Sequence, residues 1–254
     1  MAVLTEKQIK YGFDYYHKDD ARPKSVVEVS EYDGEDKLII NCTQLEESYS
    51  AKDKKRIWME WCDFLVNNPD IFTELMFCTR MPQDLFDAVC AQRRLKKLHI
   101  KWGVYPDISK LENLQELEYL HIGSGRSVSS LEPISRLVNL VALSIENFQQ
   151  IDDYAPLANL KYLESLALEG DFAAPKILKV QSLEFLRHMK QLRFFSFLTA
   201  KMIDKDYSPI LELNNLEHLT LKSCKEVKQL YPQFVKLPKL KYGTVLERPE
   251  LYEQ

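Results

Sequence analysis

His99 and His121 are the residues whose type and spacing come closest to supporting chemistry. They occupy the same position in two successive copies of a repeated apolar phrase, 22 residues apart. If the copies stack as adjacent strands, about 4.8 Å apart, the two imidazoles become neighbours on one surface. The pair could then belong to a metal site, an acid–base site or a binding patch, of which we favour the binding patch. A metal would need a third ligand, and the flanking positions hold only Met76 and Ser144.

Other signals for chemistry are weak. Catalysis would need a base oriented by a carboxylate in a closed pocket, which an open strand surface does not obviously offer. Gly123-Ser-Gly-Arg126 falls at the end of a phrase, which favours a turn over a phosphate-binding loop. The sequence contains neither a CxxC motif nor a histidine pair at zinc-finger spacing. We therefore predict a protein that is not an enzyme, with no cofactor, no metal and no small-molecule substrate.

The apolar phrase itself, leucine-x-x-leucine-x-leucine or isoleucine, recurs eight times. Its copies begin at Phe72, Leu95, Leu117, Leu140, Leu163, Leu192, Leu216 and Leu240. Alternating apolar positions within each copy indicate a short strand with one buried side. A second apolar set, three and six residues before each strand, indicates a helical turn, often preceded by a proline. One such unit cannot bury its own apolar face, so the units must stack.

This phrase resembles the leucine-rich repeat family over roughly residues 72–246, and the stretch 151–160 is similar to the short, internalin-like bacterial class. The resemblance implies an α/β solenoid, right-handed, with a parallel sheet on its concave face. One position departs from the family pattern. Eight residues after the first leucine, where the family usually has asparagine or cysteine, only Cys224 matches. We therefore expect a turn one residue longer than the family's.

Residues 1–71 lack the phrase and are predicted to form an N-terminal α/β capping region ahead of a repeat domain at 72–254. Within it, the stretch 25–41 is typical of a β-hairpin that turns at Asp33-Gly34. Residues 1–24 are rich in aromatic side chains and either pack on the cap or form a contact arm.

A helix is predicted from an N-cap at Ser50 to about Val66. Its Trp58, Trp61 and Leu65 lie on one face, and we expect them to cover the open end of the first repeat. A docking helix with exposed aromatic side chains is the alternative.

Composition and charge limit the classes of partner. The net charge is −4, yet residues 112–171 hold three Lys/Arg against ten Asp/Glu, whereas 91–110 and 222–248 are both basic. An acidic middle between basic shoulders suits either solvated surface or a partner with a matching charge pattern. Neither a signal peptide nor a membrane-spanning stretch is recognisable, and five scattered cysteines suit a reducing compartment, so the expected location is the cytoplasm.

The predicted function is non-enzymatic protein binding at the concave face, as an adaptor or inhibitor. The resemblance also implies an alternative, an immunity-type partner that neutralises a toxin or enzyme, and His99 with His121 as a metal or enzymatic site is the alternative from another class. The third, fifth and seventh phrase positions should form the binding surface. The candidate binding residues are Lys97, His99, Lys101, Trp102, Tyr119, His121, Glu146, Glu169, Phe194, His218, Lys222 and Tyr242.

Two further hypotheses concern a basic patch and an insertion in one repeat. A basic patch of Arg93, Arg94, Lys97 and Lys101 could bind nucleic acid, but an acidic chain makes this the weaker hypothesis. The unit that contains residues 171–182 is about six residues longer than its neighbours. Sequence drift and a partner-contacting ridge are both compatible with that insertion.

Overall fold

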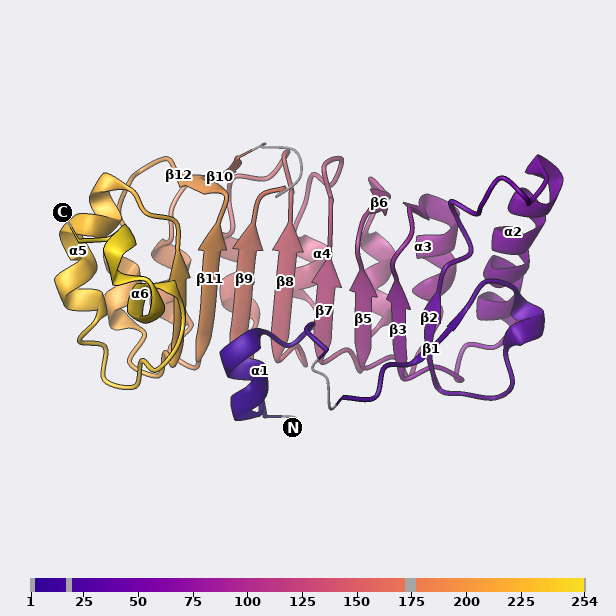
Figure 1. Cartoon of the computed structure of the whole chain (residues 1–254), viewed down its shortest axis with the longest axis horizontal. Helices are drawn as coiled ribbons and strands as arrows, with labels where there is room; N and C mark the ends of the chain where they lie inside the picture. The colour runs from indigo at the N-terminus through magenta and orange to yellow at the C-terminus, as the bar shows by residue number, and fades with distance from the viewer. Residues whose placement is uncertain (1–2, 17–19, 172–176, 254) are drawn as a thin grey trace.

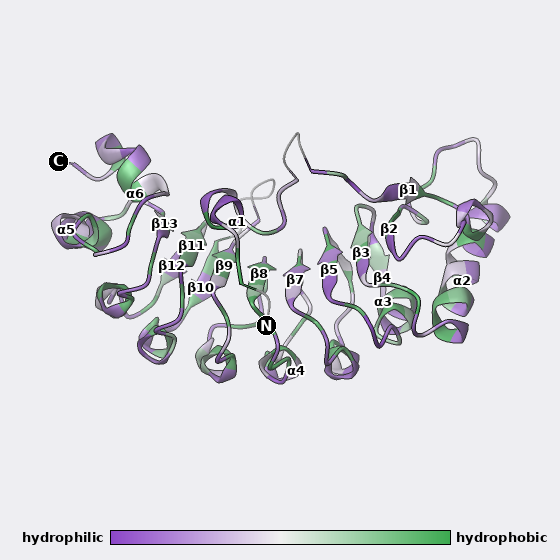
Figure 2. Ribbon diagram, turned by 90° about the horizontal axis from the view of Figure 1, so that it is seen from below, coloured by the Kyte–Doolittle hydropathy of each residue, from purple (hydrophilic) through white to green (hydrophobic). Residues whose placement is uncertain are grey.

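The computed structural model describes residues 3–16, 20–171 and 177–253. These residues form a curved solenoid, with strands on the concave side and short helices on the convex side (Figures 1 and 2). The predicted α/β leucine-rich repeat solenoid is therefore confirmed.

Seven copies of the phrase each form one strand of a parallel sheet. The strands are β3 (Glu74–Phe77), β5 (Lys97–Ile100), β7 (Tyr119–Ile122), β8 (Ala142–Glu146), β9 (Ser165–Glu169), β11 (Phe194–Leu198) and β13 (His218–Leu221). The leucines and isoleucines of the phrase point into the solenoid and are almost completely buried there. Each contributes roughly 1.5–3 kcal/mol through its burial, which makes the stacked coils one continuous core.

The eighth copy does not form a strand, and the expectation of eight strands was wrong. Tyr242 makes only an isolated bridge to His218. The reason lies at Gly243, whose φ of +98° turns the chain away and whose Cα lies against the backbone of Leu219. The chain continues into α6 (Thr244–Glu247) and the short η6 (Pro249–Leu251), and α5 (Lys225–Phe234) lies at the same end (Figure 1).

Short helices close the coils on the convex side. They are α3 (Gln83–Val89), η2 (Ser109–Asn113), α4 (Glu132–Ser135), η3 (Ala155–Asn159), η4 (Glu184–His188) and η5 (Ser208–Glu212). Pro133, Pro156 and Pro209 occupy the first turns of α4, η3 and η5, where a missing N–H costs no helical hydrogen bond. The expected place of proline ahead of the helical turn is confirmed for these three coils, whereas Pro232, for which we expected the same, lies inside α5.

Two small parallel ladders lie at the edge of the coils. One pairs β4 (Met81–Pro82) with β6 (Gly103–Val104), and the other pairs β10 (Leu178–Val180) with β12 (Ala200–Met202). The insertion at 171–182 thus contributes strand β10, whose Leu178 and Val180 are buried. Residues 172–176 of that insertion lie outside the described part of the chain.

The N-terminal region continues the same sheet with β1 (Lys24–Val26) and β2 (Lys37–Ile40), joined through η1 (Val29–Glu31). These two strands are parallel, so the predicted hairpin was wrong. A parallel pair needs a crossover, which is supplied here by the segment through η1.

Helix α2 (Ala51–Asn67) begins where the sequence predicted, with the Ser50 hydroxyl accepting a hydrogen bond from the Asp53 N–H at 3.1 Å. It lies at the N-terminal end of the solenoid (Figure 1). Trp61 and Leu65 are fully buried, and the Trp61 indole donates to the Val27 carbonyl at 2.8 Å.

Candidate protein-binding surface

The side chains that alternate with the buried leucines form rows across the concave side, which we call the concave wall. One row runs through Glu74, Lys97, Tyr119, Ala142, Ser165, Phe194, His218 and Tyr242, strand by strand. The next runs through Met76, His99, His121, Ser144, Ala167, Ser196 and Thr220. The predicted neighbourhood of His99 and His121 is confirmed, because the two residues are directly paired between β5 and β7.

The wall is partly covered by the chain's own N-terminus. Residues 3–16, which we call the arm, cross the concave side, and helix α1 (Glu6–Tyr11) lies over the sheet there (Figures 1 and 2). The sequence left open whether residues 1–24 pack on the cap or form a contact arm; the structure places residues 3–16 on the chain's own repeats. The surface that we expected to be open therefore already holds a segment.

The arm is anchored by apolar side chains. Leu4, Ile9 and Phe13 are 3%, 0% and 5% exposed. They pack in one cluster with Val141, Ala142, Ala167 and Phe194 of the wall, flanked by Tyr119 and Tyr242. The small side chains on β8 and β9 leave room for a helix to approach the sheet closely, which is why α1 lies over them.

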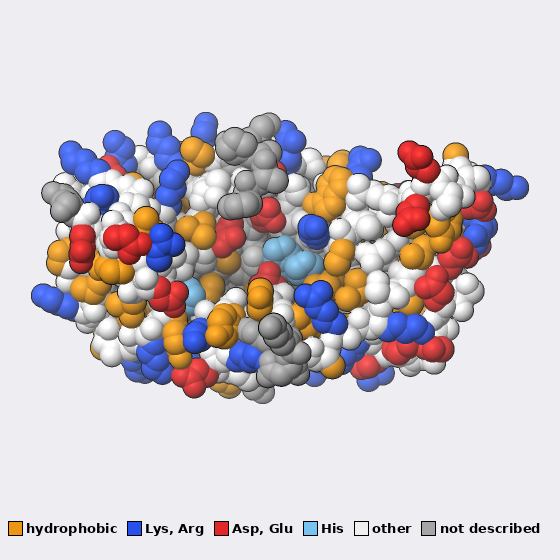
Figure 3. Space-filling view, viewed as in Figure 1, with side chains coloured by type: hydrophobic (Ala, Val, Ile, Leu, Met, Phe, Trp, Pro, Cys, Tyr) orange, Lys and Arg blue, Asp and Glu red, His pale blue; other side chains and the backbone are white. Residues whose placement is uncertain are grey.

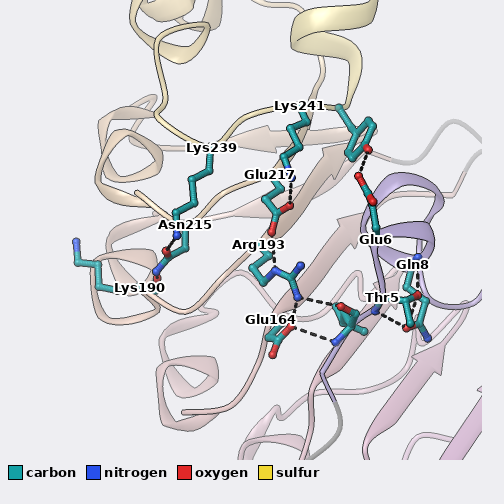
Figure 4. A network of polar contacts seen from close by, with 12 residues as sticks. Thr5, Glu6, Gln8, Glu164, Lys190, Arg193, Asn215, Glu217, Lys239 and Lys241 are labelled. Atoms are coloured by element: carbon teal, nitrogen blue, oxygen red, sulfur yellow. Dashed lines mark hydrogen bonds and ion pairs between the residues drawn. The ribbon is translucent and has the colours of Figure 1, made fainter.

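The start of the arm is held by a partly buried charge network around Arg193 (Figure 4). Arg193 donates to the Leu4 carbonyl at 2.9 Å and to the Glu164 carboxylate at 2.8 Å, and Glu164 accepts from the Leu4 N–H at 3.2 Å. Arg193 also pairs with Glu217 at 2.7 Å. Burial opposes ionisation of Glu217, but Arg193 and Lys241 outweigh it and leave its pKa below the usual value.

Helix α1 has capping at both ends. Thr5 and Gln8 form a capping box, with each side chain accepting from the other's backbone N–H. Tyr242 donates to Glu6 at 2.8 Å, which ties the first turn to the wall (Figure 4). Gly12 ends the helix at φ +94° and ψ 151°, a conformation that is open essentially only to glycine, and so directs Phe13 and Asp14 toward β7.

Asp14 brings a carboxylate to the histidine pair. Its Oδ2 lies 3.2 Å from Nδ1 of His121, and the rings of His99 and His121 stack with centroids 4.2 Å apart. Histidine side chains gather near the middle of this face (Figure 3). Burial, and then the charge of His121, lowers the pKa of His99 to about 3. Burial works against ionisation of Asp14, but the hydrogen bond and charge of His121 keep its pKa below the ordinary value.

The cluster does not have the geometry of a catalytic relay. Ser144 Oγ lies 3.0 Å from Nδ1 of His121, the same nitrogen that Asp14 contacts. In a Ser-His-Asp relay the hydroxyl and the carboxylate engage opposite nitrogens of the imidazole, so that one proton can enter as the other is held. His121 here links the arm to the wall.

A metal centre is also not favoured by this arrangement. Asp14, His99 and His121 offer ligand atoms within 4.8 Å of one another, so the arm supplies the third ligand that the sequence did not reveal. The two imidazole rings are nearly parallel, at 10° to each other. Lone pairs of parallel rings run side by side, whereas a tetrahedral ion about 2.1 Å from each nitrogen requires them to converge.

The arm ends in a charged contact with the first repeats. Tyr16 hydrogen-bonds to the carboxylate of Glu74, and Lys97 donates to the Tyr16 hydroxyl at 3.3 Å. Lys97 also pairs with Glu74 at 3.1 Å and lies over the Tyr16 ring. Burial and then the hydrogen bond to Glu74 raise the pKa of Tyr16.

The predicted binding residues differ in their accessibility. His121, Phe194 and His218 are buried, Lys101 and Lys222 are exposed, and the others are intermediate. Those of intermediate exposure are Lys97, His99, Trp102, Tyr119, Glu146, Glu169 and Tyr242. Among these residues the arm contacts Lys97, Tyr119, His121, Phe194 and Tyr242.

Sequence reasoning missed the arm residues Leu4, Ile9 and Asp14 and their partner Arg193. One local signal was present, because Thr5-x-x-Gln8 is the pattern of a capping box and predicts a helix start. Nothing in the sequence indicated where that helix would dock.

Comparison with solved structures places this fold among leucine-rich repeat proteins. An internalin (inlF) from Listeria monocytogenes is similar at a TM-score of 0.52 and 18% identity, over 81% of this chain and 51% of that one. The chain thus spans about half the length of that internalin. An internalin C2 (inlC2) of the same organism aligns at a TM-score of 0.43 and 18% identity, over 68% of each chain. The predicted resemblance to internalin-like repeats is confirmed at the level of the fold.

Neither a protein-family model nor a curated protein sequence matches the chain. Among the described residues, no helix combines the length and apolar character needed to cross a membrane.

Proposed function

We propose that this protein is a non-enzymatic protein-binding module that uses its concave wall, as an adaptor or an inhibitor of its partner. The observation that carries the proposal is the buried contact of Leu4, Ile9 and Phe13 with the wall. These side chains belong to a segment outside the repeats, so the wall can bury the apolar face of a peptide.

The dimensions of the wall support a macromolecular partner. Nine strands at about 4.8 Å spacing span roughly 38 Å, which suits a protein interface of standard size. Glu146 and Glu169 lie side by side on β8 and β9, whereas Lys101 follows β5 on one side of them and Lys222 follows the edge strand β13 on the other. That alternation of charge favours a partner with a complementary pattern and governs its rate of encounter.

Site-specific photo-crosslinking tests the proposal. A photo-reactive phenylalanine analogue replaces Lys101 or Lys222 on the wall, and Val138, which is 50% exposed outside the wall, serves as the matched control. In an extract of the producing cell, both wall positions should crosslink the same protein and Val138 should not. Equal crosslinking at all three positions, or none at the wall, would contradict the proposal.

A second comparison separates binding from chemistry. Replacing His99 and His121 together by alanine should change the affinity for the crosslinked partner. It should not abolish a reaction on that partner, since the pair lacks the geometry of a catalytic relay. A partner that is chemically altered by the native chain and left intact by the double variant would instead identify an enzyme.

A further inference from the structure

The arm packs on the repeats without being part of their hydrophobic core. The apolar cluster between arm and wall is separate from the main core of the solenoid, and none of its members belongs to that core. Its members are Leu4, Ile9, Phe13, Val141, Ala142, Ala167 and Phe194. Release of the arm would uncover an apolar floor on the wall and leave the leucine core closed.

The contacts divide into those that any peptide can make and those that need particular side chains. Arg193 and Glu164 bind the backbone carbonyl and N–H of Leu4, which every residue other than proline offers. Ile9 and Asp14, by contrast, are recognised through their side chains, Ile9 by the apolar floor and Asp14 by His121. The docked arm thus presents an apolar residue on α1 and, five residues later and past the end of the helix at Gly12, a carboxylate.

Helix α1 depends on the wall for its stability. It has six residues, well below the roughly 12–15 that an isolated helix needs in water. A helix of this length keeps its fold only while it is docked, so release of the arm and loss of the helix occur together. A competing helix therefore meets a segment that can leave.

We infer that the concave wall is a receptor for a segment of a partner protein that forms a short amphipathic helix with an apolar residue in the place of Ile9 and carries, just past the end of that helix, a carboxylate in the place of Asp14. The arm is the internal competitor which this segment displaces. The inference rests on the proposed function and specifies the partner's binding segment. A tethered segment acts at an effective concentration in the millimolar range, so the docked arm lowers the apparent affinity for the partner in proportion to the fraction of molecules that are open.

A release variant of the full chain tests this competition. Ile9→Asp puts a charge into the apolar floor and leaves the wall untouched, and Tyr11→Asp makes the same kind of change on the solvent side of α1, where Tyr11 is 51% exposed. The probe is a fluorescein-labelled peptide of residues 3–16, titrated by fluorescence anisotropy. We expect Ile9→Asp to bind the probe at least about 10-fold more tightly than the wild type and Tyr11→Asp.

Two further variants test the recognition chemistry. A probe peptide that carries Asp14→Lys should bind the released chain at least about 5-fold more weakly, because a lysine cannot accept the hydrogen bond that His121 makes with Asp14. Ala167→Glu on the wall, added to Ile9→Asp, should abolish probe binding. Unchanged thermal unfolding of the solenoid in Ile9→Asp shows that the core has kept its fold.

Several results would overturn the inference. One is equal probe binding by the wild type and Ile9→Asp, and another is the absence of binding by a folded Ile9→Asp chain. A wild-type chain that is dimeric by light scattering and monomeric as Ile9→Asp would show that the arm pairs with a second copy. A last case is that the photo-reactive residues at positions 101 and 222 still crosslink one partner while Ile9→Asp captures less of that partner than the wild type. In that case the partner binds over the docked arm, so the proposed function stands and this inference fails.

Discussion

The arm contacts two parts of the concave wall that differ in chemistry. Over β8 to β11, α1 buries apolar side chains on Ala142, Ala167 and Phe194. Over β3 to β7, the residues after Gly12 meet charged and polar groups, among them Glu74, Lys97 and His121. One segment thus uses hydrophobic burial at one end and directional polar contacts at the other.

The difference indicates that one part of the wall provides most of the affinity for the arm and the other part fixes the position of the arm along the wall. Apolar burial is not directional and supplies most of the docking free energy. Hydrogen bonds and ion pairs on a partly solvated surface contribute less, but they penalise a shifted position because a displaced charge loses its partner. We therefore expect substitutions under α1 to release the arm and substitutions near His121 to loosen only its end.

The largest effect is expected for Ile9→Asp. It loses about 1.5–3 kcal/mol of burial and adds the cost of a charge in an apolar site, so the arm should open roughly 100-fold more often. Amide hydrogen exchange at positions 9 and 12 measures that opening, because the N–H groups of these residues donate to the carbonyls of Thr5 and Gln8 in the docked helix. Tyr11→Asp is the control, and equal exchange in both variants would show that the apolar floor does not hold the arm.

Arg193→Met comes next, because it leaves Glu164 and Glu217 without their shared cation. The three side chains are only 23%, 17% and 12% exposed, and we expect a loss of about 2 kcal/mol in the free energy of unfolding by urea. Lys190→Met is the control, since Lys190 is 50% exposed in its pair with Glu212 and should cost at most about 0.5 kcal/mol. Similar losses of unfolding free energy in both variants would show that the Arg193 network stabilises the protein no more than an exposed ion pair does.

Acidification should destabilise the apolar part of the contact. Burial lowers the pKa of His218 to about 4, against which the nearby Glu247 and the backbone of Ile9 and Lys10 act only weakly. The folded state therefore binds fewer protons than the unfolded state between about pH 6.5 and 4, and stability falls as the pH drops through that window. We expect His218 to account for a loss of up to about 2 kcal/mol between pH 7 and 5, in addition to the loss from His99, whose pKa is also lowered by burial.

Urea unfolding at both pH values measures this loss, and His218→Asn, which cannot titrate, should show a smaller one. Asp14 does not contribute to the change, because a lowered carboxyl pKa loses its stabilising effect only below the ordinary carboxyl range. If the loss of stability between pH 7 and 5 is the same in His218→Asn as in the wild type, titration of His218 is not its cause.

The smallest effect is expected for Asp14→Asn, which keeps the shape and removes the charge opposite His121. Asp14 is 32% exposed, so the docked arm should lose about 1 kcal/mol, or about 5-fold in opening at Gly12. Asp20→Asn breaks the more exposed pair with Lys7 and should change opening at most about 2-fold. An Asp14→Asn effect as large as that of Ile9→Asp would reverse the proposed division between affinity and register.

The regular part of this fold follows from the sequence in detail. The phrase period predicted the stacking, the buried leucines and the adjacency of His99 to His121, because every strand repeats the same phase. The prediction was wrong where the period was interrupted. Gly243 turns the eighth copy into a helix, and the Asp33-Gly34 turn signal concealed a crossover between parallel strands.

The sequence by itself determined the solenoid and the side chains that line its concave wall, since neighbouring coils repeat one local pattern. Only the tertiary structure decided what lies against that wall. Leu4 meets Glu164 across 160 positions and Glu6 meets Tyr242 across 236, and no period links such residues. Their contact depends on the curvature of the assembled coils and on the small side chains of β8 and β9, which exist as a surface only after the chain has folded.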